Sequence, residues 1–458
     1  MNLGMLKLFR VLLVFLFLQN LYAHSSDLNF KIIKKGVQDD NTLLIVGGIQ
    51  GDEPGGFMAA SLIATHYDIT KGSVWIVPNL NFTSIIERSR GPFGDMNRKF
   101  AYISKDDPDY VDVKRIKELI TKPAVKLIVN LHDGSGYFRK KFIDNYHSPY
   151  RWGQSSIIDQ ASVNVPVYGN LAEISKEVCE KVNANLIRKE DIYHTHNTKT
   201  KLGDKEMEKT LTYYAINKGK AAFGNEASKE LPVHERTYYH LLALEKYMNI
   251  MGIEFKRKFD LQPLALRDVI DNDIYISFYN DKIKIPLSDV RNYISYFPTK
   301  KDGTIDFKPS SPVMTVIKNS NSTYSIHYGN RRLSILEPDY LDVSEKKEEV
   351  KFKIDGKEED VKIGSLVDVS DSFLVYPNDY RVNVIGYVNK AHKNESGLEI
   401  EKDEILQRFS LDVKGQIYRV EFYNKDDNKF AGMVLVKFSK KLYKEVVLNE
   451  AGKKPASL

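Results

Sequence analysis

The sequence has only one cysteine, Cys179, among its 458 residues. A single cysteine cannot form a disulfide bond within the chain, so the fold has to be stabilised by packing. Apolar residues recur at helical spacing around Cys179, at Leu171, Ile174, Val178 and Val182. This spacing favours a small buried side chain over a reactive thiol.

The sequence also lacks long low-complexity tracts and a strong excess of one charge. Apolar residues make up 42% of the chain, and the formal net charge is +6. We therefore expect most of the chain to fold. The mild positive charge would suit an anionic polymer and does not indicate a nucleic-acid-binding protein. The length exceeds what one ordinary core accommodates, which predicts two or three domains.

The apolar run near the N-terminus, residues 11–18, is too short to cross a bilayer comfortably. Lys7 and Arg10 precede the run, and Ala23 follows it. A basic start, a short apolar centre and a small residue at the cut are typical of a secretory signal. We expect cleavage near Ala23, a periplasmic location and no stable membrane anchor afterwards. An uncleaved anchor is the alternative.

Between about residues 29 and 252, apolar strands alternate with amphipathic helices. The pattern predicts strands over 30–33, 43–46, 74–77, 125–131 and 221–223, and helices over 54–66, 112–120, 171–186 and 235–251. Such alternation is typical of an α/β fold, a mixed β-sheet flanked by helices.

After about residue 258 the pattern changes to short alternating stretches broken by turns. A first all-β unit covers 273–287 and 314–336, and the charged segment 344–349 then serves as a linker. A second all-β unit follows, with strands expected over 350–354, 373–376, 382–388, 417–422 and 433–438. Strands at this spacing suit a sandwich.

Polar side chains that could bind a metal or take part in catalysis follow four of the predicted strands. The strand at 43–46 leads to Gln50 and Glu53, and the strand at 125–131 leads to His132. Glu226 follows the strand at 221–223. The remaining loop, after 74–77, carries Arg88, Arg90, Asn97 and Arg98. One sheet would gather these groups at one rim, where open α/β sheets bind ligands.

Gln50, Glu53 and His132 form a plausible zinc triad, because a catalytic zinc ion keeps three protein ligands and one open position. The glutamine amide is a neutral, weak donor, so it would hold the metal less tightly and leave it more electrophilic. Glu226 would be the general base. The arginines would neutralise an oxyanion and grip a terminal carboxylate. Taken singly, each residue has a structural alternative, and Glu53 in particular could complement a helix dipole.

These residues resemble the zinc metallocarboxypeptidases of the carboxypeptidase A type. The family pattern is a His-x-x-Glu pair, an arginine, a D-x-N-R-x-F string, a later histidine and a glutamate base. Here the string runs over residues 95–100, with Arg90 upstream, and His132 and Glu226 follow in the family's order. The resemblance covers residues 29–254. It departs from the family at Gln50, where the family has histidine.

Gln50 together with a leader and β domains resembles a narrower group, the peptidoglycan D,L-carboxypeptidases that set cell shape in helical bacteria. The resemblance implies hydrolysis of the γ-D-Glu–meso-diaminopimelate bond of muramyl tripeptide, leaving a dipeptide. It implies that Gln50, Glu53 and His132 bind zinc and that Glu226 is the base. It also implies that Arg90 stabilises the oxyanion and that Asn97 and Arg98 hold the substrate carboxylate. Trp152 is a candidate lining residue of the side-chain pocket.

The same resemblance implies a domain plan. It comprises a signal peptide at 1–23, a zinc carboxypeptidase domain at 24–255, a small β-barrel-like domain at 256–343, an immunoglobulin-like β-sandwich at 344–449 and a tail at 450–458. The β domains are candidate docking sites for cell-shape proteins. The side chain of diaminopimelate is zwitterionic, so the pocket should hold further polar groups, with His194, His196, Thr210 and Thr212 as candidates. We expect the stretch at 194–196 to be a solvated turn, with a second metal site as the alternative.

Two other functions remain open. The string at 47–53 also resembles the aspartoacylase and succinylglutamate desuccinylase branch, which hydrolyses small N-acyl amino acids; the leader and the β domains count against it. The other is a catalytically inactive scaffold that only binds wall peptides, since loss of a histidine ligand could abolish zinc binding. Zinc content would separate the scaffold from the enzyme, and hydrolysis of an N-acyl amino acid would favour the deacylase.

Overall fold

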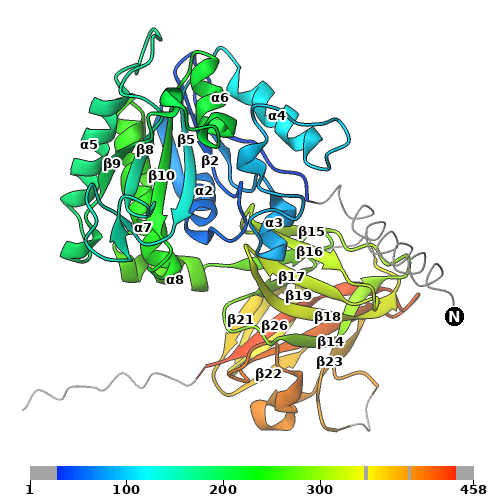
Figure 1. Cartoon of the computed structure of the whole chain (residues 1–458). Coiled ribbons are helices and arrows are strands. Elements are labelled where there is room, and N and C mark those ends of the chain that lie inside the picture. Colours follow the sequence, from blue (N-terminus) through cyan, green and yellow to red (C-terminus); the bar gives the residue numbers. More distant parts are fainter. Residues whose placement is uncertain (1–27, 345–348, 390–392, 440–458) are drawn as a thin grey trace, which may run out of the picture. The chain divides into compact units, whose positions relative to one another are not determined.

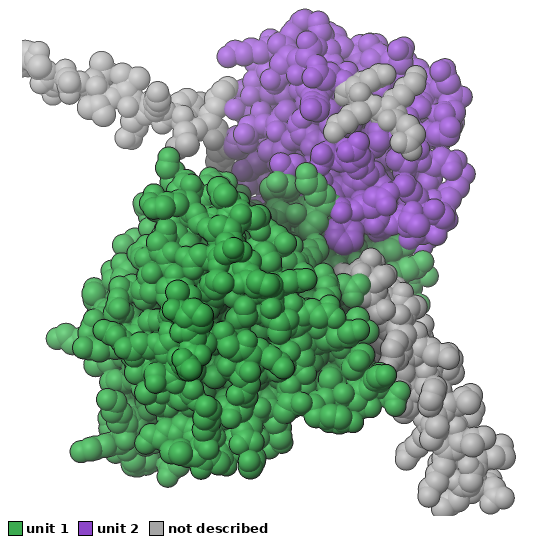
Figure 2. Space-filling model, turned by 90° about the horizontal axis from the view of Figure 1, so that it is seen from above, with its two compact units in different colours: residues 1–276, 286–288, 308–337 green, residues 277–285, 289–307, 338–458 purple. Residues whose placement is uncertain are grey.

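The computed structural model describes residues 28–344, 349–389 and 393–439. The predicted signal peptide, most of the linker at 344–349 and the tail at 450–458 lie outside the described residues. The chain forms two compact units (Figure 2). Unit 1 comprises residues 1–276, 286–288 and 308–337, and unit 2 comprises 277–285, 289–307 and 338–458. The three-domain plan stays a prediction.

A mixed sheet of seven described strands forms the centre of unit 1, in the order β1-β4-β2-β5-β10-β8-β9 (Figure 1). The strands are β1 (Ile33–Gly36), β2 (Thr42–Val46), β4 (Ser73–Val77), β5 (Val125–Gly134), β8 (Ser155–Ile158), β9 (His194–Asn197) and β10 (Ala221–Ser228). The four strands β4, β2, β5 and β10 run parallel, whereas β1 and β8 are antiparallel to their inner neighbours.

The central strands are nearly continuous apolar runs because helices flank the sheet. Every residue of β2 and β10 is buried, as expected of parallel strands covered on both faces. The helices are α2 (Pro54–His66), α3 (Phe82–Glu87), α4 (Tyr110–Ile120), α5 (Leu171–Asn183), α6 (Leu211–Asn217), α7 (Val233–Ile250) and α8 (Pro263–Asn272). Helix α7 packs against α2 and α5, while α6 packs against β5 and β10. The predicted fold class is confirmed.

Short elements complete the described part of unit 1. Two outlying strands, β3 (Tyr67–Lys71) and β11 (Glu254–Arg257), pair antiparallel, and β6 (Tyr137–Phe138) pairs with β7 (His147–Ser148). The described 3₁₀ turns of unit 1 are η1 (Met96–Arg98), η2 (Lys189–Asp191), η3 (Thr200–Leu202) and η4 (Met207–Lys209), and those described in unit 2 are η5 (Lys402–Glu404) and η6 (Gln407–Phe409). Of these, η1 and η4 matter for the site.

Two local predictions were wrong. The strand expected over 30–33 begins only at Ile33, because the carbonyl of Phe30 accepts a hydrogen bond from the Arg115 side chain instead of a neighbouring strand. The stretch at 194–196 is not a turn: it belongs to β9, which pairs in parallel with β8. Polar residues at a sheet edge give no local hydrophobic pattern, so the sequence did not reveal this strand.

The chain beyond α8 is rich in strands, which confirms the prediction of all-β structure. The next strands are β12 (Tyr275–Phe278), β13 (Ile283–Pro286), β14 (Tyr293–Lys300), β15 (Phe307–Pro309), β16 (Met314–Lys318), β17 (Tyr324–Tyr328) and β18 (Arg331–Leu341). Strands β16, β17 and β18 pair antiparallel.

Unit 2 contains two four-stranded sheets, β20-β19-β22-β24 and β21-β26-β25-β23. Their strands are β19 (Glu349–Ile354), β20 (Lys357–Lys362), β21 (Leu366–Val369), β22 (Ser372–Val375), β23 (Tyr380–Val384), β24 (Glu399–Glu401), β25 (Ile417–Asn424) and β26 (Phe430–Phe438). Inward residues of both sheets share one apolar core, so the sheets form a sandwich. The immunoglobulin-like assignment stays a prediction. Among the described residues, no helix is long and apolar enough to span a membrane.

Candidate active site

Three neighbouring strands bring the predicted site residues to one edge of the sheet. The loop after β2 carries Gln50 and Glu53, and α2 begins directly after Glu53. His132 lies near the end of β5, and its partner across the parallel ladder on β10 is Glu226. The ladder register therefore fixes the general-base candidate beside the histidine, without any loop between them.

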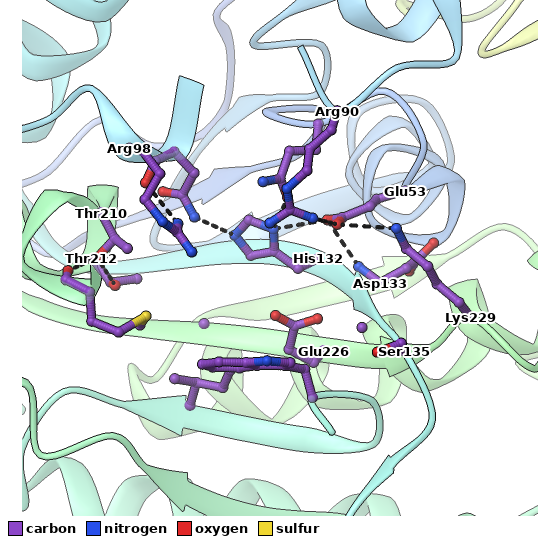
Figure 3. Close-up of a pocket in the computed structure, with 17 residues that line it drawn as sticks. Glu53, Arg90, Arg98, His132, Asp133, Ser135, Thr210, Thr212, Glu226 and Lys229 are labelled. Atoms are coloured by element: carbon purple, nitrogen blue, oxygen red, sulfur yellow. Dashed lines mark hydrogen bonds and ion pairs between the residues drawn. The ribbon is translucent and has the colours of Figure 1, made fainter. Parts of the chain in front are cut away.

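A cavity of about 260 Å³ opens at this edge. All eight residues predicted for the site line it: Gln50, Glu53, Arg90, Asn97, Arg98, His132, Trp152 and Glu226. Figure 3 shows His132 and Glu226 facing each other near the middle of this pocket. The eight residues thus lie together around one cavity, and their roles in a site stay predictions.

Three potential metal donors converge on one point. The Nδ1 atom of His132 lies 2.9 Å from Glu53 Oε2 and 3.1 Å from Gln50 Oε1. Ligands about 2.0–2.2 Å from a tetrahedral zinc ion lie about 3.3–3.6 Å from one another. The donors therefore need to separate by only a few tenths of an ångström to admit an ion, and this set fits a metal.

The Gln50 amide is held in the orientation that a metal ligand requires. Its Nε2 donates a hydrogen bond to Asp95 Oδ1 over 2.7 Å, which turns Oε1 toward His132. Arg90 Nε donates to the other oxygen of Asp95 over 3.0 Å, and Arg90 Nη1 lies 3.5 Å from Glu53 Oε1. Asp95 therefore links the neutral ligand to the arginine predicted to stabilise the oxyanion.

The far side of the His132 ring is also occupied. Its Nε2 lies 2.8 Å from the Asn130 amide nitrogen and 3.4 Å from that of Asn97. The Asn130 Oδ1 atom is buried and has no hydrogen-bond partner in the part of the chain that the structure describes. Turning the Asn130 amide over would place this oxygen against an Nε2–H, which is the tautomer needed when Nδ1 binds a metal.

Glu53 occupies the position before α2 but does not cap the helix with its side chain. Its Oε2 accepts a hydrogen bond from the Asp133 backbone N–H over 3.2 Å, in addition to facing His132. The carboxylate is 4% exposed. The contacts of this carboxylate are therefore with His132, the Asp133 backbone and Arg90, and none is a capping bond to α2.

Asp133, the residue after His132, connects α2 with α7 through its carboxylate. Its carboxylate accepts hydrogen bonds from the Gly55 N–H and from Arg236, and it faces His240 Nε2 at 3.1 Å. The other ring nitrogen of His240 lies 2.9 Å from Asn225, the neighbour of Glu226. Burial opposes ionisation, but His240, Arg236 and the Gly55 N–H together hold the pKa of Asp133 below its ordinary value.

Glu226 has the properties of a carboxylate that exchanges protons. Burial raises its pKa to about 8; the charge of His132 opposes this rise, and that of Glu53 adds to it. Its Oε2 has no hydrogen-bond partner among the described residues. A Cβ at Gly134 would lie 2.8 Å from this oxygen and 2.5 Å from Trp152, so glycine is required beneath the carboxylate.

One end of the pocket is built from polar groups around Arg98. The guanidinium lies 3.9 Å from Asp95 and 3.6 Å from Glu206, and its side chain is 29% exposed. Thr210 and Thr212 also line this pocket, and their hydroxyl oxygens are 3.2 Å apart. The side-chain oxygen Oδ1 of Asn97 accepts a hydrogen bond from the Leu211 N–H, which leaves the side-chain Nδ2 to face a ligand.

Other candidates lie outside the cavity lining. Arg88 donates to the Asn330 carbonyl, and His194 and His196 are not among the lining residues. The His196 ring stacks on Phe138 and contacts the Trp152 ring at 4.9 Å between centroids. Burial lowers its pKa to about 4. His196 therefore supports the aromatic wall of the pocket from behind.

Among the described residues, no group of three or more His, Cys, Asp or Glu side chains is placed to hold a metal. The site at this edge combines one histidine and one carboxylate with the Gln50 amide, so it depends on the neutral donor. Sequence reasoning missed the roles of Asp95 and Asp133 and the presence of Lys229 and Ser135 in the lining. For Asp95, its place in the string at 95–100 was an available signal.

Comparison with known proteins places the chain in a family. Residues 5–271 match the family described as the catalytic part of a carboxypeptidase controlling helical cell shape. Residues 343–439 match the C-terminal domain of metallo-carboxypeptidases. The chain belongs to this family. The predicted resemblance to the cell-shape carboxypeptidases is confirmed.

Solved structures of Csd4 from Helicobacter pylori, a cell shape determinant, agree with this assignment. The tripeptide-bound form is 41% identical, and the match covers 90% of this chain and 100% of that one with a TM-score of 0.80. The meso-diaminopimelate-bound form, described as a D,L-carboxypeptidase, is 42% identical over 89% and 100% of the two chains, also with a TM-score of 0.80. No curated protein sequence matches.

This cell-shape carboxypeptidase is therefore a metallocarboxypeptidase, as predicted, and membership implies a metal cofactor. The match to the carboxypeptidase family over residues 5–271 favours this activity over the deacylase alternative. The scaffold alternative is likewise not supported, because the family is one of enzymes.

Proposed function

We propose that the protein is a zinc-dependent D,L-carboxypeptidase of peptidoglycan. It would act in the periplasm and remove meso-diaminopimelate from muramyl tripeptide, leaving the dipeptide. The observation that carries the proposal is the convergence of Gln50 Oε1, Glu53 Oε2 and His132 Nδ1 beside the unpartnered Glu226 oxygen. The tripeptide-bound and diaminopimelate-bound forms of Csd4 support the substrate class.

In the proposed mechanism, Gln50, Glu53 and His132 hold the metal. When bound, the zinc ion polarises the scissile carbonyl and makes the attacking water more acidic. Glu226 accepts a proton from that water and delivers it to the leaving amine, so the amide bond is replaced by a carboxylate and a free amine. A carboxylate with a raised pKa can both take and return a proton near neutral pH.

The arginines supply charge at the two places where the reaction needs it. The Arg90 guanidinium, held by Asp95 and 3.5 Å from Glu53, stabilises the negative charge that develops on the carbonyl oxygen. Arg98 and the Asn97 Nδ2 hold the terminal carboxylate of diaminopimelate. Thr210 and Thr212 face the same end of the pocket, where they would meet the polar side chain of the leaving residue.

Incubation with purified muramyl tri-, tetra- and pentapeptides tests this proposal, with mass spectrometry as the readout. Loss of one diaminopimelate from the tripeptide alone is expected, and a chelator should abolish it until zinc is restored. Cleavage of the longer peptides, or activity that survives the chelator, would contradict the proposed specificity or the metal requirement.

A further inference from the structure

The pocket carries a second cation at the end opposite Arg98. In Figure 3, Arg98, Thr210 and Thr212 lie on one side of His132 and Glu226, whereas Lys229 and Ser135 lie on the other. Lys229 lines the same cavity. In the proposed mechanism Arg98 binds the leaving residue, so the Lys229 end receives the acyl residue, whose carbonyl is attacked.

The fold holds Lys229 firmly at this end. It comes three residues after Glu226, directly beyond β10, and its backbone N–H donates to the Gly134 carbonyl over 2.8 Å. Its ammonium group lies 2.6 Å from Asp52 Oδ2 and 3.6 Å from Glu53 Oε1. The ammonium group therefore contacts one oxygen of the Glu53 carboxylate, whose other oxygen is a candidate metal donor.

The ammonium group retains capacity for a further ligand. Lysine has three N–H donors, and the contacts with Asp52 and Glu53 use at most two of them. The side chain is 28% exposed. A lysine that served only to neutralise Asp52 would not need to reach the cavity, yet this one contributes to its lining.

The acyl residue of the proposed substrate carries a group that matches this cation. A γ-linked glutamyl residue keeps a free α-carboxylate four bonds from the scissile carbonyl carbon, about 5 Å away when extended. An ammonium close to the metal donors lies within that reach. A neutral amide at the same position would offer one acceptor oxygen without charge, and a charge-assisted hydrogen bond is stronger than a neutral one.

We propose that Lys229 is a specificity-determining residue that binds the free carboxylate of the acyl glutamyl residue. The site would therefore hydrolyse stem peptides whose glutamate is unmodified in preference to those in which this carboxylate is amidated. This inference rests on the proposed function, because it assigns the acyl side of the same site.

The test compares two muramyl tripeptides that differ only at this carboxylate, one with D-glutamate and one with D-isoglutamine. The wild-type protein should show a kcat/KM about 10- to 100-fold higher for the D-glutamate form, the range expected for one hydrogen bond to a charged group. Lys229→Met should reduce this preference to near unity by slowing the D-glutamate substrate. Lys229→Arg should keep most of the preference.

Arg98→Ala is the matched control at the other end of the pocket, since it should slow both peptides and leave their ratio unchanged. Equal kcat/KM for the two peptides in the wild-type protein would overturn the inference, as would a preference that persists in Lys229→Met. The wild-type comparison decides even if Lys229→Met does not fold.

A calorimetric measurement separates failure of this inference from failure of the proposed function. If the wild-type protein hydrolyses neither peptide with zinc present, the proposed function fails. The affinities of the two muramyl dipeptides, with free and amidated carboxylate, then decide the inference independently. Tighter binding of the free form by about tenfold supports it, and equal affinities overturn it.

Discussion

The neutral donor Gln50 depends on its neighbour for orientation. An amide can present either its oxygen or its nitrogen, and only the oxygen binds a metal. The contact between Gln50 Nε2 and Asp95 Oδ1 selects the oxygen. The Asp95 carboxylate therefore orients the Gln50 side chain with its amide oxygen toward His132.

Two substitutions test this role through zinc affinity. Gln50→His should bind zinc more tightly, because imidazole is the better donor. Asp95→Ala should weaken zinc binding about 10- to 100-fold, the usual effect of removing a group that orients a ligand. Competition with a chromophoric chelator measures both. Wild-type zinc affinity in Asp95→Ala would show that Asp95 does not orient the ligand.

Glu226 should matter for turnover and not for folding or metal binding. Glu226→Gln should lower kcat about 10²- to 10⁴-fold, since it removes the general base, while the zinc content stays at the wild-type level. Near-normal turnover would remove Glu226 from the mechanism.

The raised pKa of Glu226 also predicts how stability depends on pH. The folded protein keeps the proton on Glu226 up to about pH 8, whereas the unfolded chain releases it near the ordinary value. In the metal-free protein, this group therefore makes the free energy of unfolding fall as pH rises between these two values. Glu226→Gln should remove that part of the slope in urea titrations; an unchanged slope would contradict the burial of the carboxyl.

Arg98 should act on substrate binding. Arg98→Ala should raise KM about 10- to 100-fold for peptides with a free terminal carboxylate, because a charge-assisted hydrogen bond is lost. Amidated peptides, which lack that charge, should be affected much less. If steady-state kinetics show an equal rise in KM for free and amidated peptides, Arg98 does not bind the terminal carboxylate.

At the level of elements, the loop between β2 and α2 is shaped by close packing. A Cβ at Gly51 would lie 1.9 Å from the Ser84 carbonyl oxygen of α3, and the Gly51 N–H donates to the Ser84 hydroxyl over 2.9 Å. Gly51 therefore lets α3 approach the loop that carries Gln50 and Glu53, and this approach sets where both side chains begin.

Gly51→Ala should displace this loop and reduce both thermal stability and zinc content. Overpacking a dense site typically costs about 1–3 kcal/mol. Gly203→Ala is the control, since a Cβ there meets nothing within 4 Å and the residue only has a positive φ. It should cost about 1 kcal/mol and leave zinc content unchanged. Full zinc occupancy in Gly51→Ala would contradict the positioning role.

Helices and strands with a regular apolar pattern were predicted from the sequence, and those without one were missed. Helix α2 matched the prediction at both ends because Pro54 occupies its first turn and a regular apolar face follows. The central strands were recognised from continuous apolar runs. Strands β8 and β9 were missed because Ser155, Ser156, His194 and His196 show no apolar alternation; hydrogen bonds to the sheet define them.

The order of chemical groups along the chain was enough to select eight residues that line one cavity, and their roles there stay predictions. The contacts that support these residues were not predictable. The link between Gln50 and Asp95 joins residues 45 positions apart, and the one between Lys229 and Asp52 joins residues 177 apart. Such pairs depend on how strands are ordered in the sheet, which one sequence does not specify.

At the level of the whole molecule, the catalytic unit includes chain from beyond the predicted carboxypeptidase domain. Residues 308–337 belong to unit 1. The hydroxyl groups of Ser311 and Ser61 are 2.8 Å apart, and Asn330 donates a hydrogen bond to the Gly51 carbonyl over 3.3 Å. The segment thus contacts α2 and the loop that carries Gln50 and Glu53, so chain that follows the matched catalytic region supports the candidate site.

The central claim is that one metal ion is held by a single imidazole and two oxygen donors. X-ray absorption spectroscopy of the zinc-loaded protein tests it directly, because multiple scattering counts the imidazole ligands. We expect one equivalent of zinc with one imidazole and an otherwise oxygen shell at about 2.0–2.2 Å. Two or more imidazoles, a sulfur ligand, or failure to retain zinc would contradict the assignment of Gln50, Glu53 and His132 as the metal site.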